Sequence, residues 1–476
     1  MKQLLVLILI ITTFFGCNNN ENSCGQAYIG GEIINPNNDY LILYDDTAAI
    51  DTLYLDENNR FSYPIEALNP GLHSFVHGGE YQVVIIEPTD SIMIRLNTFD
   101  FDESLVFSGK GSKKNNYLIN LFLSLEKDDH LVYELSKLEP LLFQEKLDSI
   151  KAKNYNNLNE FRQKHTTSEL FDKVAKVAID YNYYTHKELY PHRHFGMNMA
   201  IDINALPKSY FDFRKDIDYN DEELKDFYPY YNFLFPHFNN LALEKYYKAE
   251  ESSQFNRNSI DYNLIKLEIM DELIQSEAIK NILLRYSTRN YLSNNTSFKD
   301  AEILFDSYMK KNTSKDNSEY ITNLYTTLKR LQKGNKLPEL EVLNYKNQVS
   351  TLNTVIEKPT VLYFWSSANK YHFKNSHNKV EFYKENHPDI DFISININSN
   401  NYSAWKRMLK QNYLDLDQEY RFNNPQIGKK LLAIHYINKV IITDKNGFIV
   451  VPNANMFDYD FKNLLNKLEQ KRPLKK

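Results

Sequence analysis

Two residue types in this chain could carry covalent or metal chemistry: its cysteines and its histidines. The 476-residue sequence holds two cysteines, Cys17 and Cys24, and twelve histidines. A cysteine attacks a disulfide or binds a metal as its thiolate, while a neutral histidine binds a metal or moves a proton. Because both cysteines lie within the first 24 residues, thiol chemistry is confined to the start of the chain.

Cys17 stands at a junction typical of an exported chain. Lys2 precedes an apolar run over residues 4–11, and Gly16 directly precedes Cys17. The run is too short to span a bilayer but fits the apolar region of a signal peptide. The junction resembles a bacterial lipobox, in which a small residue leaves the thiol accessible, although the two phenylalanines before Gly16 are bulkier than usual. We expect Cys17 to be acylated and to anchor the chain to a membrane; an ordinary secretory signal, or a membrane anchor with a chance cysteine, is the alternative.

The second cysteine then has no partner within the chain. If Cys17 carries a lipid, Cys24 cannot form an intrachain disulfide, so it pairs with another chain or is an incidental thiol. The polar residues that follow Cys17 indicate a tether over residues 18–26. We expect a lipoprotein of the cell envelope, on the periplasmic side of the outer membrane.

The histidines do not form a recognisable metal site. His372 and His377 are five residues apart, which is the wrong spacing for one helical face, and His435 is distant in sequence. No cysteine or ordered set of carboxylates accompanies them, so we expect neither a metal nor another cofactor. The segment His192–His194 follows several tyrosines, and we expect it to form an aromatic-lined surface loop.

Composition limits the classes of protein that fit. Apolar residues make up 42% of the chain and charged residues 25%, and the length favours two or three domains. The net charge is −6, without a sustained basic stripe, which argues against a nucleic-acid partner. The sequence also lacks the short motifs of phosphate-binding loops, serine-hydrolase elbows and zinc proteases.

Patterning divides the chain into regions of different secondary structure. Residues 1–17 form the expected signal peptide and 18–26 the tether. Short alternating segments between turn signals predict an antiparallel β-sandwich over residues 27–112. Helical periodicity over residues 113–333 predicts an irregular helical domain, and a βαβ pattern over 334–476 predicts an α/β domain. The expected fold class is therefore multidomain α+β.

Two strings in the last region carry a family resemblance. The string GNKLPELEVLN begins at Gly334, and VLYFWSSANKYHF spans Val361–Phe373. They resemble the thioredoxin-like envelope proteins of the TlpA and ResA type, and the resemblance covers about Gly334 to Lys471. Residues 51–63, 87–96 and 107–118 resemble the β domain that precedes such domains in Bacteroidota lipoproteins.

The resemblance implies that the redox motif is lost. Aligning Trp365 with the first tryptophan of the family motif puts Asn369 and His372 where the two redox cysteines belong. Asn438 then takes the place of the family's cis-proline, and we expect the Ile437–Asn438 bond to be trans, since a cis bond before a residue other than proline costs about 3–4 kcal/mol. Neither Asn369 nor His372 can form a mixed disulfide.

We therefore expect no catalytic residues and no enzyme activity. The first hypothesis is a scaffold that binds a protein or peptide in the groove near Asn369, His372 and Asn438. The alternative is an envelope enzyme related to thiol-disulfide oxidoreductases that uses non-standard residues, either Cys24 folded back from the tether or His372. A structural role in an envelope complex is a third hypothesis.

Overall fold

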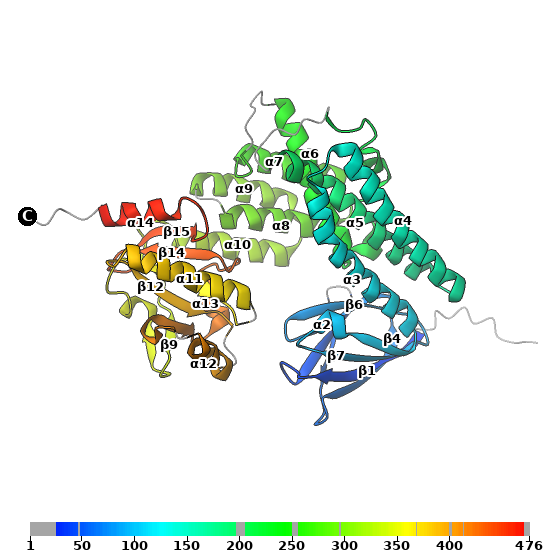
Figure 1. The fold of residues 1–476 in the computed structure, drawn as a ribbon, viewed down its shortest axis with the longest axis horizontal. Helices are drawn as coiled ribbons and strands as arrows, with labels where there is room; N and C mark the ends of the chain where they lie inside the picture. Colours follow the sequence, from blue (N-terminus) through cyan, green and yellow to red (C-terminus); the bar gives the residue numbers. More distant parts are fainter. Residues whose placement is uncertain are drawn as a thin grey trace, which may run out of the picture. The chain divides into compact units, whose positions relative to one another are not determined.

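The structure, a computed structural model, describes residues 25–45, 48–196, 205–249, 256–294, 297–367, 369–398, 402–412 and 414–470. Cys17 and Cys24, with the expected signal peptide and most of the tether, lie outside the described residues. The chain divides into two compact units, Met1–His237 and Phe238–Lys476. Figure 1 shows the strands, helices and mixed α/β region that follow one another along the sequence.

The first unit begins with two four-stranded sheets that share one core. The sheet orders are β4-β1-β7-β8 and β3-β2-β5-β6. Their strands are β1 (Gly25–Ile34), β2 (Tyr40–Asp45), β3 (Ala48–Tyr54), β4 (Arg60–Leu68), β5 (Gly71–His77), β6 (Glu80–Ile86), β7 (Ser91–Asn97) and β8 (Val106–Lys110), with the short helix α2 (Phe101–Ser104) before β8. Ile29 and Ile94 from one sheet pack with Leu43 and Phe75 from the other. The predicted sandwich is present.

The expectation that all strands are antiparallel was wrong. β1 and β7 pair in parallel, with Ile29 opposite Ile92. Alternating apolar residues indicate which face of a strand is buried, but they carry no information about its direction. The five strands between β1 and β7 provide a connection long enough for a parallel pair.

Long helices complete the first unit. They are α3 (Ser112–Leu135), α4 (Pro140–Lys164) and α5 (Glu169–Phe195), and α6 (Tyr228–Ala249) crosses the boundary between the units. Segment His192–His194 lies within α5, and His192 is buried, so the predicted surface loop was wrong. Pro191 would ordinarily break a helix. Here the buried Tyr190 ring stacks on Phe143 at 4.1 Å between centroids, and this packing favours continuation of the helix.

The second unit contains the helices that periodicity predicted. They are α7 (Ile260–Leu273), α8 (Glu277–Asn294), α9 (Phe298–Lys311) and α10 (Lys315–Arg330). Leu267 and Met270 are buried on α7, and the Oγ of Ser276 accepts a hydrogen bond from the Ile279 N–H at the start of α8. None of the helices in the described part of the chain has the length and apolar character needed to cross a membrane.

The last region has a seven-stranded sheet with the order β10-β9-β13-β12-β11-β14-β15. Its elements are β9 (Glu341–Asn344), β10 (Val349–Thr351), β11 (Thr360–Trp365), α11 (Lys370–Asn386), β12 (Asp391–Asn396), α12 (Tyr402–Gln411), β13 (Glu419–Phe422), α13 (Pro425–Leu431), β14 (Lys439–Thr443), β15 (Ile449–Asn455) and α14 (Phe461–Gln470). β11 runs parallel to β12 and antiparallel to β14, and β14 pairs antiparallel with β15. With α11 connecting the parallel pair and α14 following the hairpin, this is a thioredoxin-like topology.

The central strand and its covering helices fit the predicted pattern. Every residue of β11 is buried, as expected for a strand in the middle of a sheet. Val361 and Tyr363 on one face of β11 pack with Val380 of α11 and Leu465 of α14. β14 and β15 form an antiparallel hairpin at one edge of the sheet. These elements place the end of β11 and the start of α11 side by side.

Candidate functional site at the start of helix α11

Asn369 is the N-cap of α11. Its side-chain oxygen accepts a hydrogen bond from the backbone N–H of His372, with a donor–acceptor distance of 2.8 Å. The helix begins at Lys370, and this cap stabilises its first turn. Positive partial charge at a helix N-terminus lowers the pKa of a cysteine placed there. Asn369 occupies this position with a neutral amide.

His372 lies in the first turn of α11 and is buried, with 7% of its surface exposed. Burial and the neighbouring His377 lower the pKa of His372 below its ordinary value, and the nearby Asn438 side chain opposes that shift. The Asn438 side chain and the His372 ring are close but not hydrogen-bonded, because neither imidazole nitrogen has a partner with normal hydrogen-bond geometry. The ring packs edge-on against Phe457, with 5.9 Å between centroids. His372 is therefore a neutral, buried imidazole at neutral pH.

Asn438 lies in the exposed turn that leads into β14. The described residues contain no cis peptide bond, so the bond between Ile437 and Asn438 is trans, as predicted. Asn438 also comes close enough to His372 to affect its pKa. The structure thus brings Asn369, His372 and Asn438 together, which sequence alignment alone had placed in one groove.

A buried polar cluster lies beneath this site and was not predicted. His377 Nε2 is 3.1 Å from Glu419 Oε1, while its Nδ1 hydrogen-bonds with the Phe373 carbonyl at 2.7 Å. Ser394 Oγ donates to Glu419 Oε2 at 2.7 Å and accepts from Trp365 Nε1 at 2.8 Å. The cluster joins α11 to three neighbouring strands of the sheet.

Serine, histidine and glutamate are the residue types of a catalytic triad, but this geometry is structural. Ser394 donates to Glu419, whereas its Oγ is 3.4 Å from His377 Nε2, and a triad requires the serine to be activated by the histidine. All three side chains are buried, so a substrate has no access to the hydroxyl. The only sequence signal was polar residues inside otherwise apolar strands, and Glu419 was missed because β13 was not predicted.

Lys439, next to Asn438, was also missed. Its buried ammonium donates to the carbonyls of Leu432 and Ala433, at 2.8 and 3.2 Å, just after α13. Burial lowers the pKa of Lys439 to about 7, and the two carbonyls favour the charged form. These contacts hold the residue that follows Asn438 and so fix the turn that approaches His372.

Aromatic side chains project from the segments around His372. Tyr371 on α11 is 81% exposed, and Phe457 and Tyr459, between β15 and α14, are 38% and 96% exposed. Such rings offer large contact areas to a polypeptide at a low cost in conformational entropy. The described residues contain no group of three or more histidine, cysteine, aspartate or glutamate side chains that could hold a metal ion.

Comparison with known proteins gives similarity to solved structures alone. No protein-family model matches the chain, and no curated protein matches it. A Bacteroides vulgatus protein proposed to be a thiol-disulfide oxidoreductase is 22% identical, covers 29% of this chain and 98% of its own, and has a TM-score of 0.27. The thioredoxin domain of a thiol-disulfide oxidoreductase from the same species is 15% identical, with 28% and 96% covered and a TM-score of 0.24.

A third solved structure is described only by its fold. It is an uncharacterised thioredoxin-like protein from Porphyromonas gingivalis, 19% identical, with 28% of this chain and 90% of its own covered and a TM-score of 0.25. Each similarity spans less than a third of the chain. Part of this chain is similar to these solved structures.

Proposed function

We propose that this chain is an exported lipoprotein whose thioredoxin-like region binds a protein or peptide and performs no thiol-disulfide exchange. The observation that carries the proposal is the start of α11, where Asn369 caps the helix and His372 is buried, while the sequence has no cysteine after residue 24. Exchange requires a thiolate attacking a sulfur atom. Neither side chain supplies one, so the chemical step is absent and not merely slow.

The surroundings of His372 support binding over the enzyme alternative. A histidine that acts as a general base is commonly oriented by a carboxylate. Neither imidazole nitrogen of His372 has a hydrogen-bond partner in the described part of the chain. The nearby carboxylate of Glu419 instead pairs with His377.

Loss of redox chemistry is tested by insulin reduction. The full chain carrying Cys24→Ser is compared with an intact thioredoxin as a positive control and with buffer. We expect the rate to equal the buffer rate. Reduction of insulin above that rate would contradict the proposal, because the variant has no thiol near the groove.

Binding is tested by site-specific photo-crosslinking. A benzophenone amino acid replaces Tyr371 or Phe457 in the full chain in its native membranes, and Tyr54 on β3, which is 70% exposed, is the matched control. We expect the same polypeptide to be captured from Tyr371 and Phe457, and not from Tyr54. Equal capture from all three positions, or capture from Tyr54 alone, would contradict a ligand in the groove.

Export rests on Gly16 and Cys17, at the end of the apolar run. We propose a lipid on Cys17 as the membrane contact, an envelope location on the periplasmic side of the outer membrane, and no nucleic-acid partner. Mass spectrometry of the mature N-terminal peptide tests this part. An unmodified Cys17, or cleavage at another residue, would refute the anchor without affecting the binding proposal.

A further inference from the structure

A second site of a different kind lies within the first unit. A cavity of about 510 Å³ is lined by the turn before β7, the end of β8 and the ends of α3, α4 and α5. Ligand pockets for small molecules commonly measure about 300–1,000 Å³. We propose that this cavity binds a small phosphate-bearing molecule.

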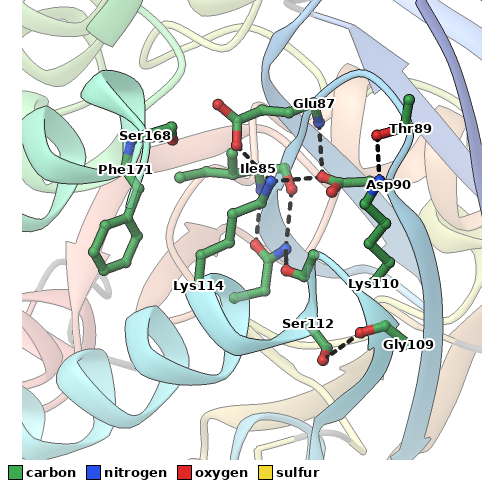
Figure 2. Close-up of polar contacts among 12 residues, drawn as sticks. Ile85, Glu87, Thr89, Asp90, Gly109, Lys110, Ser112, Lys114, Ser168 and Phe171 are labelled. Atoms are coloured by element: carbon green, nitrogen blue, oxygen red, sulfur yellow. Dashed lines mark hydrogen bonds and ion pairs between the residues drawn. The ribbon is translucent and has the colours of Figure 1, made fainter. Parts of the chain in front are cut away.

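The lysines of the cavity are only partly neutralised. Lys114 Nζ lies 2.6 Å from both Glu87 Oε2 and Asp90 Oδ2, and Figure 2 shows its ammonium between the two carboxylates. Asp90 is also tied to the Glu87 backbone N–H, at 2.9 Å. These three side chains form a satisfied structural group with a net charge of −1. They hold the start of α3 against the turn before β7.

Three further lysines outweigh that charge. Lys110 Nζ donates to the hydroxyl of Thr89 at 2.6 Å (Figure 2), and Lys113 Nζ lies 3.4 Å from Nδ1 of His165. Among the described residues, neither lysine forms an ion pair. Lys164 pairs only loosely with an exposed glutamate on its own helix, at 3.8 Å. The cavity therefore carries excess positive charge, although the whole chain has a net charge of −6.

Helix ends add to this field. The N-cap of α3 is Gly111, against which the Asp90 carboxylate lies, and the N-cap of α5 is Ser168, whose hydroxyl accepts from the Phe171 N–H. The first-turn N–H groups of a helix lack intrahelical partners and carry positive partial charge. α4 ends at the same cavity with the opposite partial charge, which Lys164 in its last turn offsets. Phosphate oxygens suit ammonium groups and helix N-termini together.

The remaining lining favours an ester over the free ion. Phe161 contributes part of an aromatic side chain that also packs against Tyr117 and Phe171, and Thr166, Thr167 and Ser168 offer hydroxyl groups. A cavity of this size is several times larger than phosphate itself. A phosphorylated sugar, or the phosphate-bearing headgroup of a lipid, matches the combination of cations, hydroxyls and one aromatic wall.

The test is calorimetric titration of the full chain at low salt with glucose 1-phosphate, inorganic phosphate and glucose. Vesicles of phosphatidylglycerol, with phosphatidylcholine vesicles as a blank, form a separate sedimentation arm. The variants are Lys110→Gln with Lys113→Gln, the charge-keeping Lys113→Arg, and Lys127→Gln, an exposed lysine further along α3. Circular dichroism confirms that each variant is folded.

We expect glucose 1-phosphate or phosphatidylglycerol to bind, and glucose and phosphatidylcholine not to bind. The double variant should bind about tenfold or more weakly, because it lacks two ammonium groups that would form charge-assisted hydrogen bonds to the phosphate. Lys113→Arg and Lys127→Gln should bind like the parent chain. Binding of the soluble ester identifies a free ligand, and binding of vesicles alone identifies a lipid headgroup. No binding to either probe, or equal binding by the double variant and Lys127→Gln, would overturn the proposal.

Discussion

Two buried histidines, one among the helices of the first unit and one in the thioredoxin-like region, differ in how their polar atoms are satisfied. His237 on α6 has its Nδ1 2.7 Å from Glu188 Oε1 and its Nε2 2.7 Å from the Tyr219 hydroxyl. Arg214 donates to both oxygens of the same glutamate, at 2.8 and 2.6 Å. His372 is buried without a hydrogen bond to either nitrogen.

This difference in hydrogen bonding distinguishes a structural network, around His237, from a candidate binding site, around His372. A buried polar group that is fully paired contributes to a unique fold, whereas an unpaired one costs free energy and requires an explanation. His237 belongs to a closed network inside the helices. His372 lies beside the exposed rings of Tyr371 and Phe457, where a bound polypeptide could supply the missing partner.

The largest expected effect comes from opening the closed network. Burial by itself raises the pKa of Glu188, but Arg214 and His237 outweigh it and lower the pKa to about 2. Glu188→Ala therefore removes the carboxylate that pairs with Arg214 and His237 inside the fold, and we expect a loss of about 3–5 kcal/mol of stability. Urea unfolding followed by circular dichroism measures it, with the exposed Glu145→Ala on α4 as control. A loss within about 0.5 kcal/mol of the control would mean that the network does not stabilise the fold.

Replacing His372 with an apolar residue should change stability in a way that depends on pH. The lowered pKa of His372 means that the unfolded chain binds more protons than the folded chain below the ordinary histidine pKa of about 6.5. Above that pH, the lowered pKa of His372 does not affect the stability of the parent chain. As the pH falls toward the folded-state pKa, the chain loses about 1.4 kcal/mol of stability for each unit by which the folded-state pKa lies below the unfolded-state pKa.

His372→Leu removes this loss and the unpaired nitrogens. Its melting temperature relative to the parent chain should rise when the pH is lowered from about 7.5 to about 5. The exposed His130→Leu on α3 should show no such trend. A difference that stays constant with pH, or that falls in acid, would show that His372 is paired in solution.

The smallest effect concerns the cap of α11. Asn369→Ala removes the acceptor for the His372 N–H and should cost about 1 kcal/mol, while Asn369→Asp keeps the acceptor and should cost little. Thermal unfolding of the two variants measures this. Equal stability would mean that Asn369 does not fix the start of the helix.

Short segments in which two independent sequence signals agree on the same structure were predictable from sequence. The buried strand β11 combines a continuous apolar run with the string that carries the family resemblance. The cap of α11 by Asn369 was not predicted, because the first turn of this helix is polar.

Features that depend on distant residues could not be predicted. The parallel pairing of β1 with β7 and the meeting of His377 with Glu419 join segments far apart in sequence. The surface loop predicted at His192–His194 was wrong because packing around Tyr190 belongs to the interior of the fold, and the segment continues α5. Local sequence patterns predict single helices and strands, whereas polar contacts between elements can be identified only when the fold is known.

The central claim is that the start of α11 is the place of a redox motif whose thiols are missing. Restoring them tests it directly: Asn369→Cys and His372→Cys are introduced into the full chain with Cys17 and Cys24 changed to serine. The number of free thiols in the folded protein is measured before and after mild oxidation. We predict that both thiols disappear as an intramolecular disulfide, because the two positions lie one helical turn apart at a capped helix start. Two thiols that stay free in a folded monomer would contradict the account.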